Sequence, residues 1–130
     1  MVEQEKQKLK RRRRVVIIDD EAAFSTLLTK MVSEFGYEVT VSPDPRSSRT
    51  YELRDSDIVF IDILMPHVSG IQVLEQLARQ NVKSAVVLMS GQGDRLNEAE
   101  KLAKKLGLYL IGVLEKPFRL ADVELILEGV

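Results

Sequence analysis

Residues 58–61 are apolar at consecutive positions, and the run ends on a carboxylate, Asp62. Such a run is typical of a parallel strand that helices cover on both faces, because a strand with one wet face alternates apolar and polar side chains. In sheets of this kind, ligands bind beyond the carboxyl ends of the strands. The segment therefore predicts a buried parallel strand that carries Asp62 to a ligand-binding edge.

Strand-like and helix-like segments alternate along the chain. Apolar or alternating runs predict further strands at residues 15–18, 37–41, 85–89 and 109–114. Apolar residues at three- and four-residue spacing predict helices at residues 24–35, 71–78, 96–106 and 120–127, with a short helix at 47–53. This order indicates five strands, each followed by a helix.

Helix ends and faces can be assigned from single residues. Ser69 and Asp94 precede two predicted helices and are expected to cap them, because their side chains can accept hydrogen bonds from free backbone N–H groups. Gly36 is expected to end the first helix. The apolar faces that we expect to turn inward include Leu27 and Leu120.

Five alternations of strand and helix predict an α/β fold. The expected architecture is a doubly wound, five-stranded parallel sheet with helices on both faces and right-handed crossovers. The common small solution is the flavodoxin-like strand order 2-1-3-4-5, in which the switch point lies between the first and third strands. Asp19, Asp20 and Asp62 end those two strands, so we expect them to meet.

Composition indicates an ordinary globular domain. The chain has 130 residues, of which 45% are hydrophobic and 30% charged, and we find neither an apolar run of membrane-spanning length nor a secretory signal. The absence of cysteine excludes disulfides, thiolate metal sites and cysteine catalysis. We therefore predict a cytoplasmic protein without a membrane partner.

The charge of the chain is concentrated at its start. Residues 1–14 carry seven Lys or Arg and two Glu, a net charge of +5, which leaves −6 for the remainder of a chain whose net charge is −1. A basic segment can bind nucleic acid, but this one contains no aromatic residue to stack on bases. We predict a solvated basic tail at 1–13 and one domain at 14–130, with nucleic acid an improbable partner.

Polar side chains end four of the predicted strands. Asp19 and Asp20 end the first strand, Asp62 the third and Ser90 the fourth, and Lys116 lies just beyond the fifth. Three carboxylates at one edge repel one another unless some are protonated or a cation lies among them. Oxygen ligands with open positions suit Mg²⁺, so we predict a Mg²⁺ site here.

This set of groups suits phosphoryl transfer to an aspartate. One carboxylate can attack phosphorus and form an acyl phosphate. Mg²⁺ and Lys116 would neutralise charge on the phosphoryl oxygens, and Ser90 would donate a hydrogen bond to one of them.

Four short segments resemble one family. Residues 15–21 with their paired acids, 60–66 (Phe-Ile-Asp-Ile-Leu-Met-Pro), 88–91 (Leu-Met-Ser-Gly) and 115–118 (Glu-Lys-Pro-Phe) resemble the receiver domain of bacterial two-component response regulators, which has the CheY-like fold. Order and spacing agree, and the resemblance covers about residues 13–128. The four segments together are far more specific than any one alone.

The resemblance implies a role for each site residue. Asp62 would be the phosphoacceptor, Asp20 a direct Mg²⁺ ligand and Asp19 a ligand through water, and the Leu64 carbonyl would complete the protein's share of the metal shell. Ser90 would be the switch hydroxyl and Lys116 the phosphate-binding ammonium, with Lys116-Pro117 a cis peptide. A histidine kinase or phosphotransfer protein and an output domain or effector would be the partners, and a homodimer is left open.

Two positions depart from the family pattern. Val113 stands where the family often has an aromatic switch residue, which puts ring-based coupling in doubt. Ser90 and Lys116 are 26 positions apart, which predicts an extended fourth helix or helix exit. The segments 89–94, 102–108 and 112–118 look like receivers joined to EAL-type cyclic di-GMP phosphodiesterases, although no EAL domain fits in this chain.

Two other functions compete with a signalling receiver. A Mg²⁺-dependent phosphohydrolase of the haloacid-dehalogenase type would need a second acid two residues after its nucleophile, where this chain has Leu64. The other is a receiver-like interaction module that is never phosphorylated, and the complete pocket argues against it. We therefore predict a phosphorylated signalling domain that catalyses only its own phosphotransfer and dephosphorylation.

Overall fold

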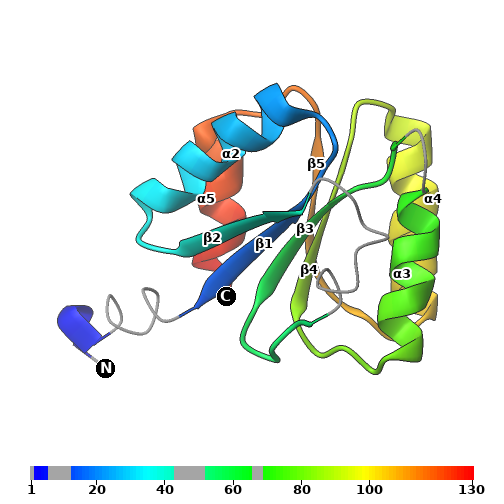
Figure 1. Cartoon of the computed structure of the whole chain (residues 1–130), viewed down its shortest axis with the longest axis horizontal. Coiled ribbons are helices and arrows are strands. Elements are labelled where there is room, and N and C mark those ends of the chain that lie inside the picture. The colour runs from blue at the N-terminus through cyan, green and yellow to red at the C-terminus, as the bar shows by residue number, and fades with distance from the viewer. Residues whose placement is uncertain (1, 6–12, 43–51, 66–68) are drawn as a thin grey trace.

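The computed structural model describes residues 2–5, 13–42, 52–65 and 69–130. Five parallel strands form one sheet, in the order β2-β1-β3-β4-β5 (Figure 1). The strands are β1 (Arg14–Ile18), β2 (Glu38–Ser42), β3 (Ile58–Asp62), β4 (Ala85–Ser90) and β5 (Tyr109–Glu115). The predicted strand order and the α/β, flavodoxin-like fold class are confirmed.

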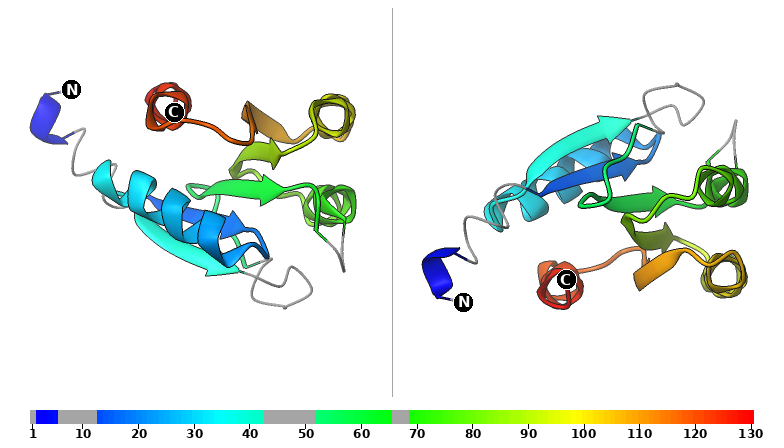
Figure 2. Two further views of the ribbon diagram at one scale, coloured as in Figure 1. Left: turned by 90° about the horizontal axis from the view of Figure 1, so that it is seen from above. Right: turned by 90° about the horizontal axis from the view of Figure 1, so that it is seen from below.

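Helices cover both faces of the sheet. They are α2 (Ala22–Glu34), α3 (Gly70–Arg79), α4 (Gly93–Lys105) and α5 (Leu120–Glu128). Figure 2 shows α2 and α5 on one face, and α3 and α4 on the other. None of the helices in the described part of the chain combines the length and the apolar character that crossing a membrane requires.

The two layers of helices enclose two apolar clusters. Alternate residues of β1 point to opposite faces, so Val15 and Ile17 pack under α2 and α5 while Val16 and Ile18 pack under α3 and α4. All residues of β3 are buried, as the unbroken apolar run predicts for a central strand. The core therefore encloses β3 on both faces, and the carboxyl end of this strand carries Asp62.

Local predictions of helix ends are partly confirmed. Ser69 caps α3 through a capping box with Gln72, and Gly36 ends α2 with a φ of +89°. The predicted Asp94 cap is wrong, because α4 begins at Gly93 and its N-cap residue is Gln92, two positions before Asp94. Asp94 lies in the first turn, where its charge still complements the helix dipole.

One further sequence-based expectation is wrong, and two others lie mostly outside the described residues. Leu27 and Leu120 are 47% and 39% exposed, because the buried stripes of α2 and α5 run through other positions. The short helix expected at 47–53 lies mostly outside the described residues, and its last two residues are not helical. The basic tail at 1–13 also lies mostly outside them.

A bulge in β5 lengthens the chain between Ser90 and Lys116. Val86 pairs with Leu110 but Val87 pairs with Gly112, so one residue of β5 is extra. A Cβ at Gly112 would lie 2.8 Å from side-chain atoms of Ile126, so the absence of a side chain lets α5 approach β5. The bulge thus places one extra residue in β5, between Ser90 and Lys116.

Gly70 sets the path of the loop after β3. A Cβ on Gly70 would lie 2.3 Å from the Cα of Ile63, a distance that no side chain can adopt. The Gly70 N–H donates to the Ile63 carbonyl at 3.2 Å. Because only glycine allows this contact, the start of α3 lies directly against the loop that carries Leu64 away from the sheet edge.

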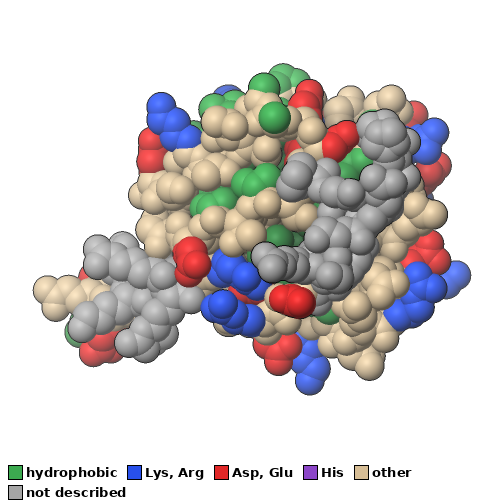
Figure 3. Space-filling model, in the orientation of Figure 1, with side chains coloured by type: hydrophobic (Ala, Val, Ile, Leu, Met, Phe, Trp, Pro, Cys, Tyr) green, Lys and Arg blue, Asp and Glu red, His purple; other side chains and the backbone are tan. Residues whose placement is uncertain are grey.

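A partly buried ion pair lies at the opposite end of the sheet, where the strands begin. Arg14 Nη2 lies 2.6 Å from Asp57 Oδ2, and Arg14 Nε donates to Asp57 Oδ1 at 3.3 Å. Asp57 is fully buried, and its Oδ2 also accepts from the Arg54 N–H at 2.8 Å. Basic and acidic side chains adjoin near the start of β1 (Figure 3). The last arginine of the basic run is therefore part of the fold.

We expect Asp57→Ala to lower the free energy of unfolding by about 3–5 kcal/mol, because it leaves a partly buried guanidinium and a backbone N–H without their acceptor. Chemical denaturation would measure the loss. Asp55→Ala, at an exposed position of the adjacent turn, is the control and should change stability by no more than about 0.5 kcal/mol. Equal effects of the two substitutions would contradict a stabilising role for the pair.

Candidate functional site

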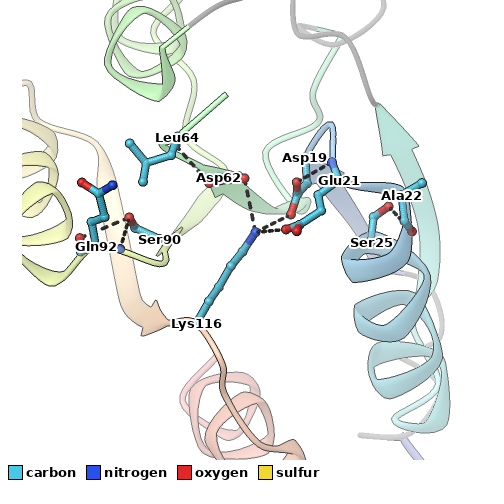
Figure 4. Close-up of polar contacts among 9 residues, drawn as sticks. All are labelled: Asp19, Glu21, Ala22, Ser25, Asp62, Leu64, Ser90, Gln92 and Lys116. Carbon is cyan, nitrogen blue, oxygen red and sulfur yellow. Dashed lines mark hydrogen bonds and ion pairs between the residues drawn. The ribbon is translucent and has the colours of Figure 1, made fainter. Parts of the chain in front are cut away.

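The carboxyl ends of the strands bring the predicted site residues to one edge of the sheet. Asp19 follows β1, Asp62 ends β3, Ser90 ends β4 and Lys116 follows β5 (Figure 4). Ile18 pairs with Ile61 in the sheet, so the ends of β1 and β3 lie level. The strand order alone therefore places the first two of these groups beside each other.

Three carboxylates at this edge could hold a metal ion. One oxygen each of Asp19, Asp20 and Asp62 lies within 4.8 Å of the others. Asp19 and Asp62 are buried, whereas Asp20 is exposed. This donor set contains only oxygen and remains open on the side of Asp20, which fits a hard cation such as Mg²⁺ that keeps several of its waters.

Lys116 binds three carboxylates with its ammonium group. Its Nζ lies 3.0 Å from Asp19 Oδ2, 3.2 Å from Asp62 Oδ2 and 3.2 Å from Glu21 Oε1. The ammonium also lies 4.0 Å from the centre of the Phe24 ring, within the range of a cation–π interaction. One side chain therefore joins the ends of the first, third and fifth strands.

Backbone hydrogen bonds orient the two buried carboxylates. Asp19 Oδ1 accepts from the Glu21 N–H at 2.9 Å, and Asp62 Oδ1 accepts from the Leu64 N–H at 3.0 Å. In each carboxylate the other oxygen, Oδ2, faces Lys116. The loops after β1 and β3 thus hold the carboxylates in matching orientations around one ammonium.

Ser90 lies at the same edge, but its hydroxyl does not contact Asp62. Ser90 Oγ accepts from the Gln92 N–H at 2.9 Å and donates to the Gln92 carbonyl at 3.2 Å. Figure 4 shows this pair set apart from the Lys116 cluster. The Lys116 N–H donates to the Ser90 carbonyl at 2.8 Å, and the Lys116-Pro117 bond is cis, as predicted.

Two residues at the site have contacts that sequence reasoning missed. The sequence places Glu21 directly after the paired acids and Phe24 in the helix that follows, but it does not indicate that either residue contacts Lys116. Phe24 also packs edge-on against Phe118, with ring centres 5.0 Å apart. The position of Glu21 directly after the paired acids was a signal for it, but nothing in the sequence pattern marks Phe24 as a partner of Lys116.

The electrostatics of the cluster are strongly perturbed. Burial, together with the neighbouring Asp19 charge, raises the pKa of Asp62 from 3.8 to about 6, although the Leu64 N–H and Lys116 oppose the rise. Burial lowers the pKa of Lys116, but the hydrogen bond to Asp19 and the charge of Asp62 outweigh burial, so this pKa is raised. Lys116 therefore remains protonated, whereas ionising Asp62 costs free energy.

Comparison with known proteins defines the class of domain that carries this site. Residues 15–128 match the response regulator receiver domain family, and the chain belongs to that family. It is a receiver domain of two-component signalling.

Individual relatives agree with this class. A response regulator of known structure from Colwellia psychrerythraea is 31% identical, with a TM-score of 0.81 over 90% of this chain and 94% of that one. The alkaline phosphatase synthesis transcriptional regulatory protein PhoP of Bacillus subtilis is 27% identical over 79% of this chain and 42% of its own length. Full-length FixJ from B. japonicum is 27% identical over 89% of this chain and 56% of that chain, with a TM-score of 0.71. The chain thus spans less than half the length of PhoP.

In metal-free protein we expect Asp62→Asn to raise the free energy of unfolding at neutral pH by about 1–3 kcal/mol, because it removes a costly buried charge. The pKa of Asp62 is about 6 in the folded chain against 3.8 ordinarily, so the wild type loses stability as pH rises from about 4 through about 6. Asparagine does not titrate, so its advantage should grow across that window and then stay constant. Denaturation at several pH values would test this, and an advantage that does not vary with pH would contradict it.

Proposed function

We propose that Asp62 is the phosphoacceptor of this receiver domain and takes a phosphoryl group from a histidine kinase or a phosphotransfer protein. The observation that carries the proposal is the cluster in which Lys116 contacts Asp19 and Asp62 while Asp20 completes a set of three carboxylates. A nucleophile, a cation site and a fixed positive charge lie within one sheet edge. These are the components that phosphoryl transfer requires.

The transfer step is a displacement at phosphorus. An Asp62 carboxylate oxygen attacks phosphorus, the bond from phosphorus to the donor imidazole nitrogen breaks, and an acyl phosphate forms. Because the pKa of Asp62 is about 6, the carboxylate is mostly ionised and nucleophilic at neutral pH. Lys116 is held beside it and donates to a phosphoryl oxygen, which stabilises the charge that the transfer brings to the site.

The metal site follows from the same residues. Asp19, Asp20, Asp62 and the Leu64 carbonyl would hold Mg²⁺, which when bound supplies positive charge against the phosphoryl oxygens. The Leu64 N–H already fixes one Asp62 oxygen, so the loop after β3 orients the nucleophile, and the same loop would supply the Leu64 carbonyl. Water would later attack phosphorus and break its bond to the Asp62 oxygen, which releases inorganic phosphate and restores the carboxylate. The domain would act on no external substrate.

Ser90 is the proposed switch, and Gln92 is the residue that it would release. Gln92 is the N-cap residue of α4, and both of its backbone polar groups bond Ser90 Oγ. If the hydroxyl turns to donate to a phosphoryl oxygen, the start of α4 loses these two bonds. Val113, packed in the apolar cluster with Leu106 and Leu110, offers no ring to move, so the signal would pass through the backbone before α4.

The partners are proposed at the level of class. The donor would be a histidine kinase or phosphotransfer protein, and the recipient an output domain or effector protein. The sequence resemblance of segments 89–94, 102–108 and 112–118 favours an EAL-type cyclic di-GMP phosphodiesterase as that recipient. PhoP and DctD, which the chain matches over 42% and 17% of their lengths, are transcriptional regulatory proteins.

Incubation with Mg²⁺ and a small acyl phosphate should add one phosphoryl group to the wild-type chain, as intact-mass measurement would show. Asp62→Asn should abolish the addition, because its amide is not a nucleophile towards phosphorus, and a chelator should abolish it in the wild type. Asp94→Asn removes an exposed carboxylate from the first turn of α4 and should label like the wild type. Equal labelling of Asp62→Asn and the wild type would overturn the assignment.

A further inference from the structure

Lys116 has no spare hydrogen-bond donor in this structure. An ammonium group carries three N–H donors, and the Lys116 Nζ has three carboxylate oxygens at 3.0, 3.2 and 3.2 Å. The ring of Phe24 lies 4.0 Å from the same nitrogen. A phosphoryl oxygen can therefore bind Lys116 only if one of the present acceptors gives way or shares a donor.

The three acceptors differ in how easily they can be released. The side chains of Asp19 and Asp62 are 0% and 5% exposed, whereas that of Glu21 is 62% exposed. A buried carboxylate that loses its cation becomes an unpaired buried charge, which is costly. An exposed carboxylate that loses its cation is solvated by water at little cost. Glu21 is thus the partner that can be exchanged.

Phosphorylation changes the acceptors around Lys116. The attack converts one Asp62 oxygen into the bridging oxygen of an acyl phosphate, which is a weaker acceptor than a carboxylate oxygen, and it brings three strongly accepting phosphoryl oxygens to the site. The Glu21 carboxylate then lies within hydrogen-bonding reach of the same ammonium as a negatively charged phosphoryl group. Two anionic groups compete for one cation, and the competition weakens the binding of the phosphoryl group.

Resting on the phosphoacceptor role proposed for Asp62, we propose that Glu21 is a positioning residue that competes with the phosphoryl group for Lys116. In the unphosphorylated domain Glu21 holds the ammonium between the carboxylates and the Phe24 ring. In the phosphorylated domain it releases the ammonium to the phosphoryl oxygens. Glu21 therefore limits how strongly the active state is stabilised.

Glu115 provides a matched control for the loss of charge. It ends β5 at the same edge of the sheet and is exposed, and its carboxylate lies on the side of Gly93. The carboxylates that contact the Lys116 ammonium within the described residues are Asp19, Glu21 and Asp62, so Glu115 is not among them. Glu115→Gln removes the same charge as Glu21→Gln from the same edge without touching Lys116.

The experiment is a calorimetric titration of the full chain with beryllofluoride, an acyl-phosphate mimic, at saturating Mg²⁺. Glu21→Gln should bind the mimic about two- to fivefold more tightly than the wild type, the range expected for loss of one exposed ion pair. Glu115→Gln should bind it as the wild type does.

A second measurement is an NMR spectrum of metal-free protein. The Lys116 Cε and Hε resonances should shift in Glu21→Gln and stay in place in Glu115→Gln, a difference that a merely structural role of Glu21 would not produce.

The outcomes separate this inference from the proposed function. If the wild type binds the mimic and Asp62→Asn does not, but Glu21→Gln binds it no more tightly than the wild type, Glu21 is not a competitor and the inference falls alone. An equal gain in Glu115→Gln would also overturn it, since the effect would then be general charge. If the wild type binds no mimic at all, the phosphoacceptor role fails and the inference fails with it.

Discussion

The site depends on one ammonium group held at the meeting point of three strand ends. Lys116 follows β5, an outer strand of the sheet, yet its side chain reaches one carboxylate that follows β1 and one that ends β3. The ammonium therefore lies beside the carboxyl ends of these two inner strands. The carboxylates would repel one another without a cation, and Lys116 supplies one in metal-free protein. The parallel order of the strands brings these charges together, and the charges in turn hold the loops after the strands.

Much of the fold could be predicted from hydrophobic periodicity, because most strands and helices bury the apolar face that their own sequence pattern defines. The all-apolar run before Asp62 correctly indicated a strand covered on both faces, and the strand ends correctly located the acidic edge. Errors arose where tertiary packing decides the outcome, as at Leu27 and at Leu120. The bulge in β5 was not predicted, because a shift of register between two strands leaves no signal in the apolar pattern of either strand.

The sequence predicted that these polar side chains converge, but it did not predict their individual contacts. The sequence indicated which carboxylates meet, but not that Lys116 is already fully occupied or that Ser90 is bonded to Gln92. Such contacts depend on side-chain rotamers and loop paths, which the periodicity of the sequence does not indicate. Glu21 illustrates the limit, since its contact with the ammonium depends on a side-chain rotamer that its place in the sequence does not determine.

The Arg14–Asp57 pair lies at the end of the sheet where the strands begin, away from Asp19, Asp20 and Asp62. β1 begins at this end, and α5 runs back from the carboxyl end of β5, so Val130 also lies towards it (Figure 1). A fluorescent protein or affinity label fused after Val130 would therefore begin on the far side of the molecule from Asp62. Such a fusion would leave the carboxylate edge open, so a labelled chain could report on a phosphodonor without shielding the site it must reach.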